Sequence, residues 1–184
     1  MNILSLFSGI GGLELGLEWA GLGATRWQVE QDAFARQVLA HHWPEAQRFE
    51  DVCEVTGGDF PGCDVICGGF PCQDISQAGY RTEGIDGHRS GLWAEFARLI
   101  CELRPRLVIV ENVPDLTVRG LARVLGGLAA LRYDAEWQTV SASDAGAPHI
   151  RTRLFVLALA HADRGGRRES SQQFPGESLS LIHI

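Results

Sequence analysis

The sequence predicts an α/β fold with a doubly wound, mostly parallel β-sheet. Short apolar runs of strand length alternate with stretches of helical periodicity, which is typical of βαβ units. The chain has 184 residues, of which 45% are hydrophobic and 21% are charged. This balance is that of a globular protein, and the length is that of one domain with a proper core.

The clearest strands are predicted from short apolar runs, and the helices from apolar residues at helical spacing. We expect strands over residues 3–7, 25–30, 47–49, 64–67, 107–110, 133–140 and 153–159. We expect helices over residues 13–20, 33–43, 92–103 and 121–131. Gly21 ends the first helix and Asp32 caps the second, because glycine and aspartate are favoured at these helix ends.

The folded domain is expected over residues 1–160, because the composition shifts at His161 to arginine, glycine, serine and glutamine. Residues 161–184 are interpreted as a linker or a truncated tail. No apolar run approaches the ~20 residues that span a bilayer, and the N-terminus lacks the basic start of a signal peptide. Five cysteines without disulfide-like spacing suit a reducing compartment. We therefore expect a cytoplasmic protein with no membrane partner.

The chain is acidic, with a formal net charge of −7. Because nucleic-acid-binding proteins usually carry a basic surface, this charge weakens the case for nucleic-acid binding without excluding it. It fits a catalytic core whose main DNA-contacting region lies elsewhere.

A glycine loop follows the first strand, in the segment Leu6-Phe7-Ser8-Gly9-Ile10-Gly11-Gly12. Glycines at the carboxyl end of a strand let the backbone approach a ligand, at the edge where open α/β sheets bind cofactors. Glu30, at the end of the next strand, is placed to hydrogen-bond ribose hydroxyls. Glu14 stands where a nicotinamide-binding loop has its third glycine, so the loop indicates a nucleoside-bearing cofactor without naming it. A plain tight turn stays open as the alternative.

Cys72 is the candidate nucleophile, in the segment Gly68-Gly69-Phe70-Pro71-Cys72-Gln73. It follows a buried strand, and Pro71 fixes the local φ and stiffens the approach of the thiol. Its polar neighbours argue against a small buried hydrophobe, which is the role we assign to Cys67 and Cys101 in their apolar stretches. We expect no metal site, because the cysteines lack the C-x2-C spacing of zinc sites.

Charged residues lie beside two later strands. Glu111, in Glu111-Asn112-Val113, follows the 107–110 strand, at the same sheet edge as the two loops above. Arg151 and Arg153 enter the last strand, where alternation puts both on one face, available to an anion or a base edge. A capping or solvated acid is the alternative for Glu111, and a surface pair is the alternative for the two arginines.

Together these segments resemble the C5-cytosine DNA methyltransferase family. The matching stretches are Leu6-Phe7-Ser8-Gly9-Ile10-Gly11-Gly12, Gly69-Phe70-Pro71-Cys72-Gln73, Glu111-Asn112-Val113 and Arg151-x-Arg153. The resemblance covers about residues 2–160. It implies a seven-stranded Rossmann-like sheet of the S-adenosylmethionine-dependent methyltransferase type, with S-adenosyl-L-methionine as the cofactor and double-stranded DNA as the partner.

The resemblance implies a role for each catalytic residue. Cys72 matches the thiolate that adds to C6 of cytosine, so that C5 can attack the methyl group. Glu111 matches the acid that engages the base around N3. Arg153, and with it Arg151, match residues that steady the base and the cysteine. Because the target atom is inaccessible in a stacked duplex, the family flips the base into its pocket.

The resemblance also implies cofactor and DNA contacts. Phe7 matches an aromatic residue that packs on adenine, Glu30 matches the ribose ligand, and Asp51 matches the residue that contacts the adenine amino group. The other matching cofactor positions are Gly9, Gly11, Pro71 and Leu92. The matching DNA contacts are Gln73, Ser76 and Arg89, in the segment over 73–90 that resembles the family's catalytic loop.

The chain also departs from the family's pattern. His149 stands in place of a usual glutamine, and Gln31 in place of a frequent tryptophan. Nothing corresponds to the target-recognition region and the last motifs, so we expect a truncated chain or one completed by a second polypeptide. An inactive fragment, or one subunit of a split enzyme that binds cofactor, therefore stays open as the alternative. A Rossmann oxidoreductase with a redox cysteine is a further alternative, but this chain lacks the third glycine and the C-x-x-C motif expected of it. A purely structural role would leave the matching motifs unexplained.

Overall fold

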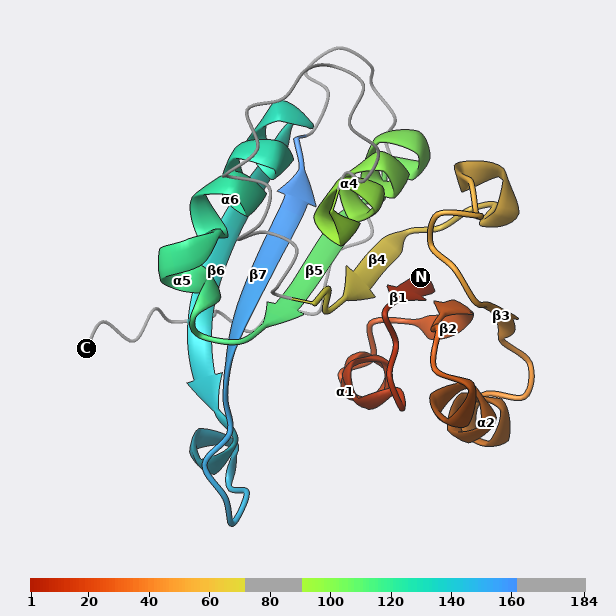
Figure 1. The fold of residues 1–184 in the computed structure, drawn as a ribbon, viewed down its shortest axis with the longest axis horizontal. Helices are drawn as coiled ribbons and strands as arrows, with labels where there is room; N and C mark the ends of the chain where they lie inside the picture. Colours follow the sequence, from red (N-terminus) through yellow and green to blue (C-terminus); the bar gives the residue numbers. More distant parts are fainter. Residues whose placement is uncertain (72–90, 162–184) are drawn as a thin grey trace.

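The computed structural model describes residues 1–71 and 91–161, which form a seven-stranded sheet with flanking helices (Figure 1). The strands are β1 Asn2–Leu6, β2 Ala24–Val29, β3 Gln47–Phe49, β4 Val65–Gly68, β5 Leu107–Asn112, β6 Tyr133–Ser141 and β7 Thr152–Ala160. The α-helices are α1 Gly12–Trp19, α2 Ala33–His42, α4 Leu92–Leu103, α5 Leu116–Arg119 and α6 Leu121–Ala130. Two 3-10 turns, η1 Gly57–Asp59 and η2 Ala142–Ala145, complete the described elements.

The sheet has the strand order β3-β2-β1-β4-β5-β7-β6. The pairs among the first five strands are parallel, and β7 runs antiparallel to both β5 and β6. The expected α/β class with a mostly parallel sheet is therefore confirmed. The order of the chain reverses between β1 and β4, and open α/β sheets bind ligands at such a switch point, beyond the carboxyl ends of the strands.

Helices cover the two faces of the sheet unequally. On one face, α4 and α6 pack over β4, β5 and β7 and enclose the larger core. On the other face, α1 packs through Leu13 and Leu17 onto a smaller cluster that includes Ile3, Cys67 and Ile109. Figure 1 shows α1 and α2 beside β1 and β2, and α4, α5 and α6 beside β4 to β7.

The α1 face of β7 carries exposed leucines. Leu157 and Leu159 pair with Ile109 and Leu107 of β5, and they are 49% and 61% exposed. Residues directly opposite in an antiparallel pair share a face, so these leucines continue the apolar surface on which α1 packs. The described helices leave this part of the sheet open to solvent.

Most predicted elements lie where the sequence placed them, with three differences. Cys101 was expected to be buried, but it is exposed: the buried stripe of α4 passes through Leu99 and Ile100, and the next residue turns outward. Glu111 was expected after its strand, but it lies within β5 because β5 pairs with β7 through Asn112. The helix α5 was not predicted.

Within the described ranges, no helix is long and apolar enough to cross a membrane.

The aromatic cluster under α4 provides the first test. Phe96 is fully buried, and its ring packs against Phe7, Phe70 and Trp93. We expect Phe96→Ala to lower the free energy of unfolding by about 3–5 kcal/mol, because it leaves a cavity in a close-packed core. Phe34→Ala is the matched control, since Phe34 is 70% exposed. Urea unfolding followed by tryptophan fluorescence measures both; equal effects would contradict the assigned core.

Candidate functional site

The glycine loop is held close to the end of β2 by hydrogen bonds. The amide of Ser8 donates to the Val29 carbonyl at 3.2 Å, and the amide of Gly9 donates to Oε2 of Glu30 at 2.6 Å. The other oxygen of Glu30 accepts from the amide of Asp32 at 2.8 Å. Phe7 has a φ of 56°, a backbone conformation that a non-glycine residue adopts only when its surroundings impose it. The loop thus has one defined shape, with Glu30 fixed beside it.

Gly11 allows this loop to lie against α2. Its φ is +91°, and a Cβ at this position would lie 2.3 Å from the Trp43 ring. Gly12 differs, because a Cβ there would meet nothing within 4 Å. Gly11 is therefore required by both its backbone conformation and its packing.

A cavity of about 290 Å³, called here the Glu30 cavity, opens beyond the ends of β1, β2 and β3. It brings together five of the cofactor residues predicted from the sequence, and these are Phe7, Glu30, Asp51, Pro71 and Leu92. Gln31, where a tryptophan was noted as frequent, also lines it. An aromatic ring, three carboxylates and apolar side chains around one hollow suit a nucleoside, which needs a stacking surface and acceptors for its hydroxyl and amino groups.

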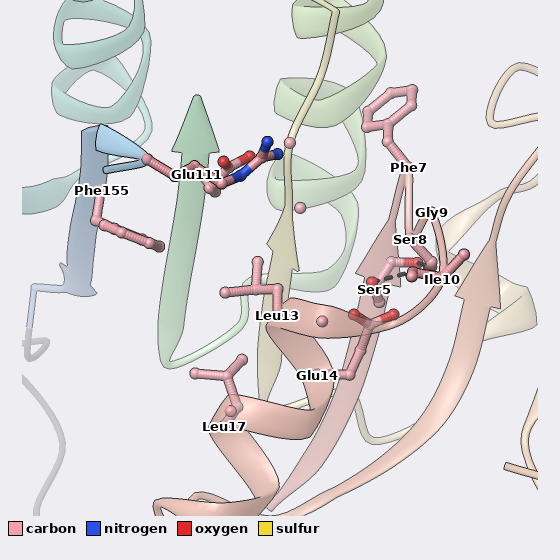
Figure 2. Close-up of a pocket in the computed structure, with 15 residues that line it drawn as sticks. Ser5, Phe7, Ser8, Gly9, Ile10, Leu13, Glu14, Leu17, Glu111 and Phe155 are labelled. Atoms are coloured by element: carbon pink, nitrogen blue, oxygen red, sulfur yellow. Dashed lines mark hydrogen bonds between the residues drawn. The ribbon is translucent and has the colours of Figure 1, made fainter. Parts of the chain in front are cut away.

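A second cavity of about 600 Å³, called here the Glu111 cavity, lies between α1 and the ends of β4 and β5. Figure 2 shows Glu111 and Phe155 on one side of it and the glycine loop with α1 on the other. Gly9 and Arg151 also line this cavity. Phe7 and Gly69 line both cavities, so the two hollows adjoin at the switch point of the sheet.

An ion pair stands at the edge of the Glu111 cavity. The Arg153 Nε lies 2.8 Å from Oε1 of Glu111, and both side chains are partly buried. Arg153 also donates to the carbonyl of Thr152 at 2.8 Å. A Cβ on Gly69 would lie 2.6 Å from Oε2 of Glu111, so only glycine leaves room for the carboxylate in this position. The pair thus holds one carboxylate in a fixed orientation.

Asn112 joins β5, the strand that carries Glu111, to the segment that precedes Cys72. Its buried side-chain amide donates to the carbonyl of Phe70 at 2.9 Å, and its Oδ1 accepts from the amide of Val113. Sequence reasoning included Asn112 in a motif but assigned it no role. The structure shows that it ties β5 to the backbone at Phe70, two residues before Cys72.

Four predicted site residues lie outside the described residues: Cys72, Gln73, Ser76 and Arg89. Two other cysteines are described and buried. Burial raises the pKa of Cys63 to about 12 and raises that of Cys67 well above its usual value. Since the thiolate is the nucleophile, neither is suited to nucleophilic catalysis.

The fold and the two adjoining cavities define a class of protein: an α/β protein whose sheet switch point carries a hollow suited to a nucleoside beside an oriented carboxylate. The family model for C-5 cytosine-specific DNA methylases matches residues 1–182. The chain belongs to the C-5 cytosine-specific DNA methylase family, which confirms the resemblance noted in the sequence.

Relatives and solved structures agree with this assignment. The chain is 39% identical over 171 residues to the Type II methyltransferase M2.BsuMI of Bacillus subtilis, covering 89% of this chain and 43% of the relative. It is 36% identical to M.CviJI of Paramecium bursaria Chlorella virus IL3A, with shares of 85% and 42%. An E. coli structure described as a prophage-encoded DNA modification methyltransferase superposes with a TM-score of 0.71 at 34% identity, covering 87% of this chain and 47% of that one. The Spodoptera frugiperda DNMT2 structure shares the fold, with a TM-score of 0.73 at 19% identity and shares of 96% and 56%.

The chain thus spans less than half the length of these two curated relatives.

The loop makes a prediction about Gly11. We expect Gly11→Ala to lower the free energy of unfolding by roughly 1–2 kcal/mol from its left-handed backbone alone, and by more because the Trp43 ring must move. Gly12→Ala is the matched control and should change stability by less than about 1 kcal/mol. Denaturant unfolding with tryptophan emission measures both effects. If Gly11→Ala is as mild as Gly12→Ala, the loop does not pack on Trp43.

Proposed function

We propose that this chain is the cofactor-binding and catalytic part of a DNA (cytosine-5-)-methyltransferase. It transfers a methyl group from S-adenosyl-L-methionine to C5 of a cytosine flipped out of double-stranded DNA. The observation that carries the proposal is the pair of adjoining cavities: the Glu30 cavity suits a nucleoside, and the Glu111 cavity presents an oriented carboxylate. The Type II names of the relatives favour a place in restriction–modification.

The residues of the Glu30 cavity fit the adenosine part of this cofactor. Phe7 offers its ring to the adenine, and Asp51 offers an acceptor to the adenine amino group. Glu30 binds two backbone amides, but a carboxylate has about four acceptor positions, so it can also receive the ribose hydroxyls. When bound, S-adenosyl-L-methionine supplies an electrophilic methyl group on its sulfonium.

The catalytic steps fall to Cys72, Glu111 and the arginines. The Cys72 thiolate adds to C6 of cytosine, which makes C5 nucleophilic enough to take the methyl group. Glu111 engages the base around N3 as charge develops there, and Arg153 keeps its carboxylate oriented at 2.8 Å. Loss of the C5 proton and elimination of Cys72 then release 5-methylcytosine. Arg151, which lines the Glu111 cavity, steadies the flipped base.

DNA contacts are assigned to Gln73, Ser76 and Arg89. The domain that carries these functions extends over residues 1–160.

A second candidate is a fragment or a subunit of a split methyltransferase, which binds the cofactor but needs a partner for DNA recognition. Three observations favour it. The chain covers 43% of M2.BsuMI, its net charge is −7, and Leu157 and Leu159 leave an apolar surface open on the sheet. A supplementary polypeptide would cover that surface and bring the basic groups that DNA binding requires.

Methyl transfer tests the proposal. We expect labelled methyl from S-adenosyl-L-methionine to appear in DNA cytosine with the wild-type chain, and to be lost with Cys72→Ser, because a hydroxyl is a much poorer nucleophile than a thiolate. Glu111→Gln should slow transfer by about 10²–10⁴-fold. DNA containing 5-fluorocytosine should trap an adduct on Cys72, and an adduct on another cysteine would refute the mechanism. No transfer, with cofactor binding retained, would favour the split enzyme.

Cofactor binding by the isolated chain is a separate prediction. Glu30→Ala should weaken S-adenosyl-L-methionine binding by about 10–100-fold, because it removes an acceptor for the ribose hydroxyls. This is the loss expected for hydrogen bonds to a charged group. Glu45→Ala, at an exposed position outside both cavities, is the matched control. Isothermal titration calorimetry gives the dissociation constants. Unchanged binding in Glu30→Ala would place the ribose elsewhere.

A further inference from the structure

Glu14 is a fully buried carboxyl that the proposed mechanism does not use. It is the third residue of α1, with an exposed fraction of 0%. Among the described residues, neither of its oxygens has a hydrogen-bond partner of good geometry. A buried carboxyl in this state opposes folding, and a leucine would fill the same space without that penalty. The position therefore calls for a reason other than packing.

Two serine hydroxyls connect Glu14 to the glycine loop. Ser8 Oγ donates to the carbonyl of Ser5 at 3.2 Å and lies 2.9 Å from Ser5 Oγ. The Glu14 carboxyl points toward Ser5 (Figure 2). Ser8 is the first residue of the loop after Phe7, whose left-handed backbone needs support from its surroundings. A chain of polar groups thus runs from α1 through β1 to the residue that follows Phe7.

The surroundings of Glu14 favour its neutral form. Burial raises the pKa of the Glu14 carboxyl, and the hydroxyls of Ser5 and Ser8 lower it in part. Glu18, on the same helix, raises the pKa further. Cys67, on β4, also faces this carboxyl, and Glu14 contributes to the raised pKa of that thiol. A protonated carboxyl has both a donor and an acceptor, so it can continue the hydrogen-bond chain through Ser5.

We propose that Glu14 is a positioning residue that, through Ser5 and Ser8, holds the Phe7–Gly11 loop in the shape that faces both cavities. The identity of the ligand that this loop binds rests on the proposed function, but the effect of Glu14 on the shape of the loop does not. Gly9 and Gly11 report the effect directly, because their amides donate to Glu30 and to the Ser8 carbonyl within the loop.

A positioning role and a purely structural role predict different results for Glu14→Leu. If Glu14 only stabilised the fold, removing it would lower global stability. If it positions the loop, removing the buried carboxyl also removes its desolvation penalty, so global stability stays unchanged or rises while the loop loses its anchor. Glu14→Gln keeps a donor and an acceptor, so it should rescue the loop.

The experiment is hydrogen exchange of the cofactor-free chain at one pH, resolved at Gly9 and Gly11. We expect Glu14→Leu to speed exchange at both amides by at least about tenfold, with Glu14→Gln within about threefold of wild type. Thr25→Val is the matched control, because it removes another buried, unpartnered polar atom and leaves Ser8 untouched. It should leave exchange at the loop unchanged.

The unfolding free energy gives a second readout. Because folding raises the pKa of Glu14, wild-type stability should fall relative to Glu14→Gln as pH rises through that pKa, and the two should converge at acid pH. Three results would each overturn the proposal. The loop amides of Glu14→Leu could exchange at the wild-type rate, Glu14→Leu could lose global stability, or Glu14→Gln could fail to restore the wild-type exchange rate. Absence of S-adenosyl-L-methionine binding by the wild type would refute the proposed function instead, and the exchange result would still decide the role of Glu14.

Discussion

The parallel pairing of β1 with β4 is the constraint on which the site depends. It sets Leu6 opposite Gly68, so the residues that follow, Phe7 and Gly69, emerge side by side at the edge of the sheet. Both line the two cavities. The Glu30 cavity adds residues that follow β2 and β3, and the Glu111 cavity adds residues of α1 together with Glu111 and Phe155. A one-residue slip of β1 against β4 would turn every side chain of β1 to the opposite face. The contacts of Phe7 and Ser8 would then be lost together.

The sequence was sufficient for the sheet and for much of the Glu30 cavity. All seven strands were expected from the sequence, the central ones from their apolar runs, and residues at the carboxyl ends of parallel strands necessarily meet at one edge. Glu30 was placed in this way from the end of β2. Phe7 and Asp51, which the family resemblance implied as cofactor contacts, follow β1 and β3 at the same edge. Asp32 was likewise identified as a cap from its position alone, and its side chain accepts from the amide of Ala35.

Other features depend on register or on rotation about a helix axis, which an apolar run does not reveal. The Glu111–Arg153 ion pair forms because the antiparallel β5–β7 ladder sets Glu111 opposite Phe155, and no local signal specifies that register. Cys101 was assigned to the core because its stretch is apolar, although the helix turns it outward. Glu14 resembles an ordinary acid in the first turn of a helix, and only the packing of α1 shows that it is buried.

The short distance between Gly69 and Glu111 limits how this sequence can evolve. Any side chain at position 69 would occupy the space of the carboxylate, so even alanine there would displace Glu111 from Arg153. A smaller residue at position 111 would relieve that clash and at the same time remove the acid. A side chain at position 69 is therefore sterically compatible only with a smaller residue at position 111, so a change at the first position depends on a change at the second. A homologue that has lost this glycine should also have lost the glutamate, and with it the chemistry of the Glu111 cavity.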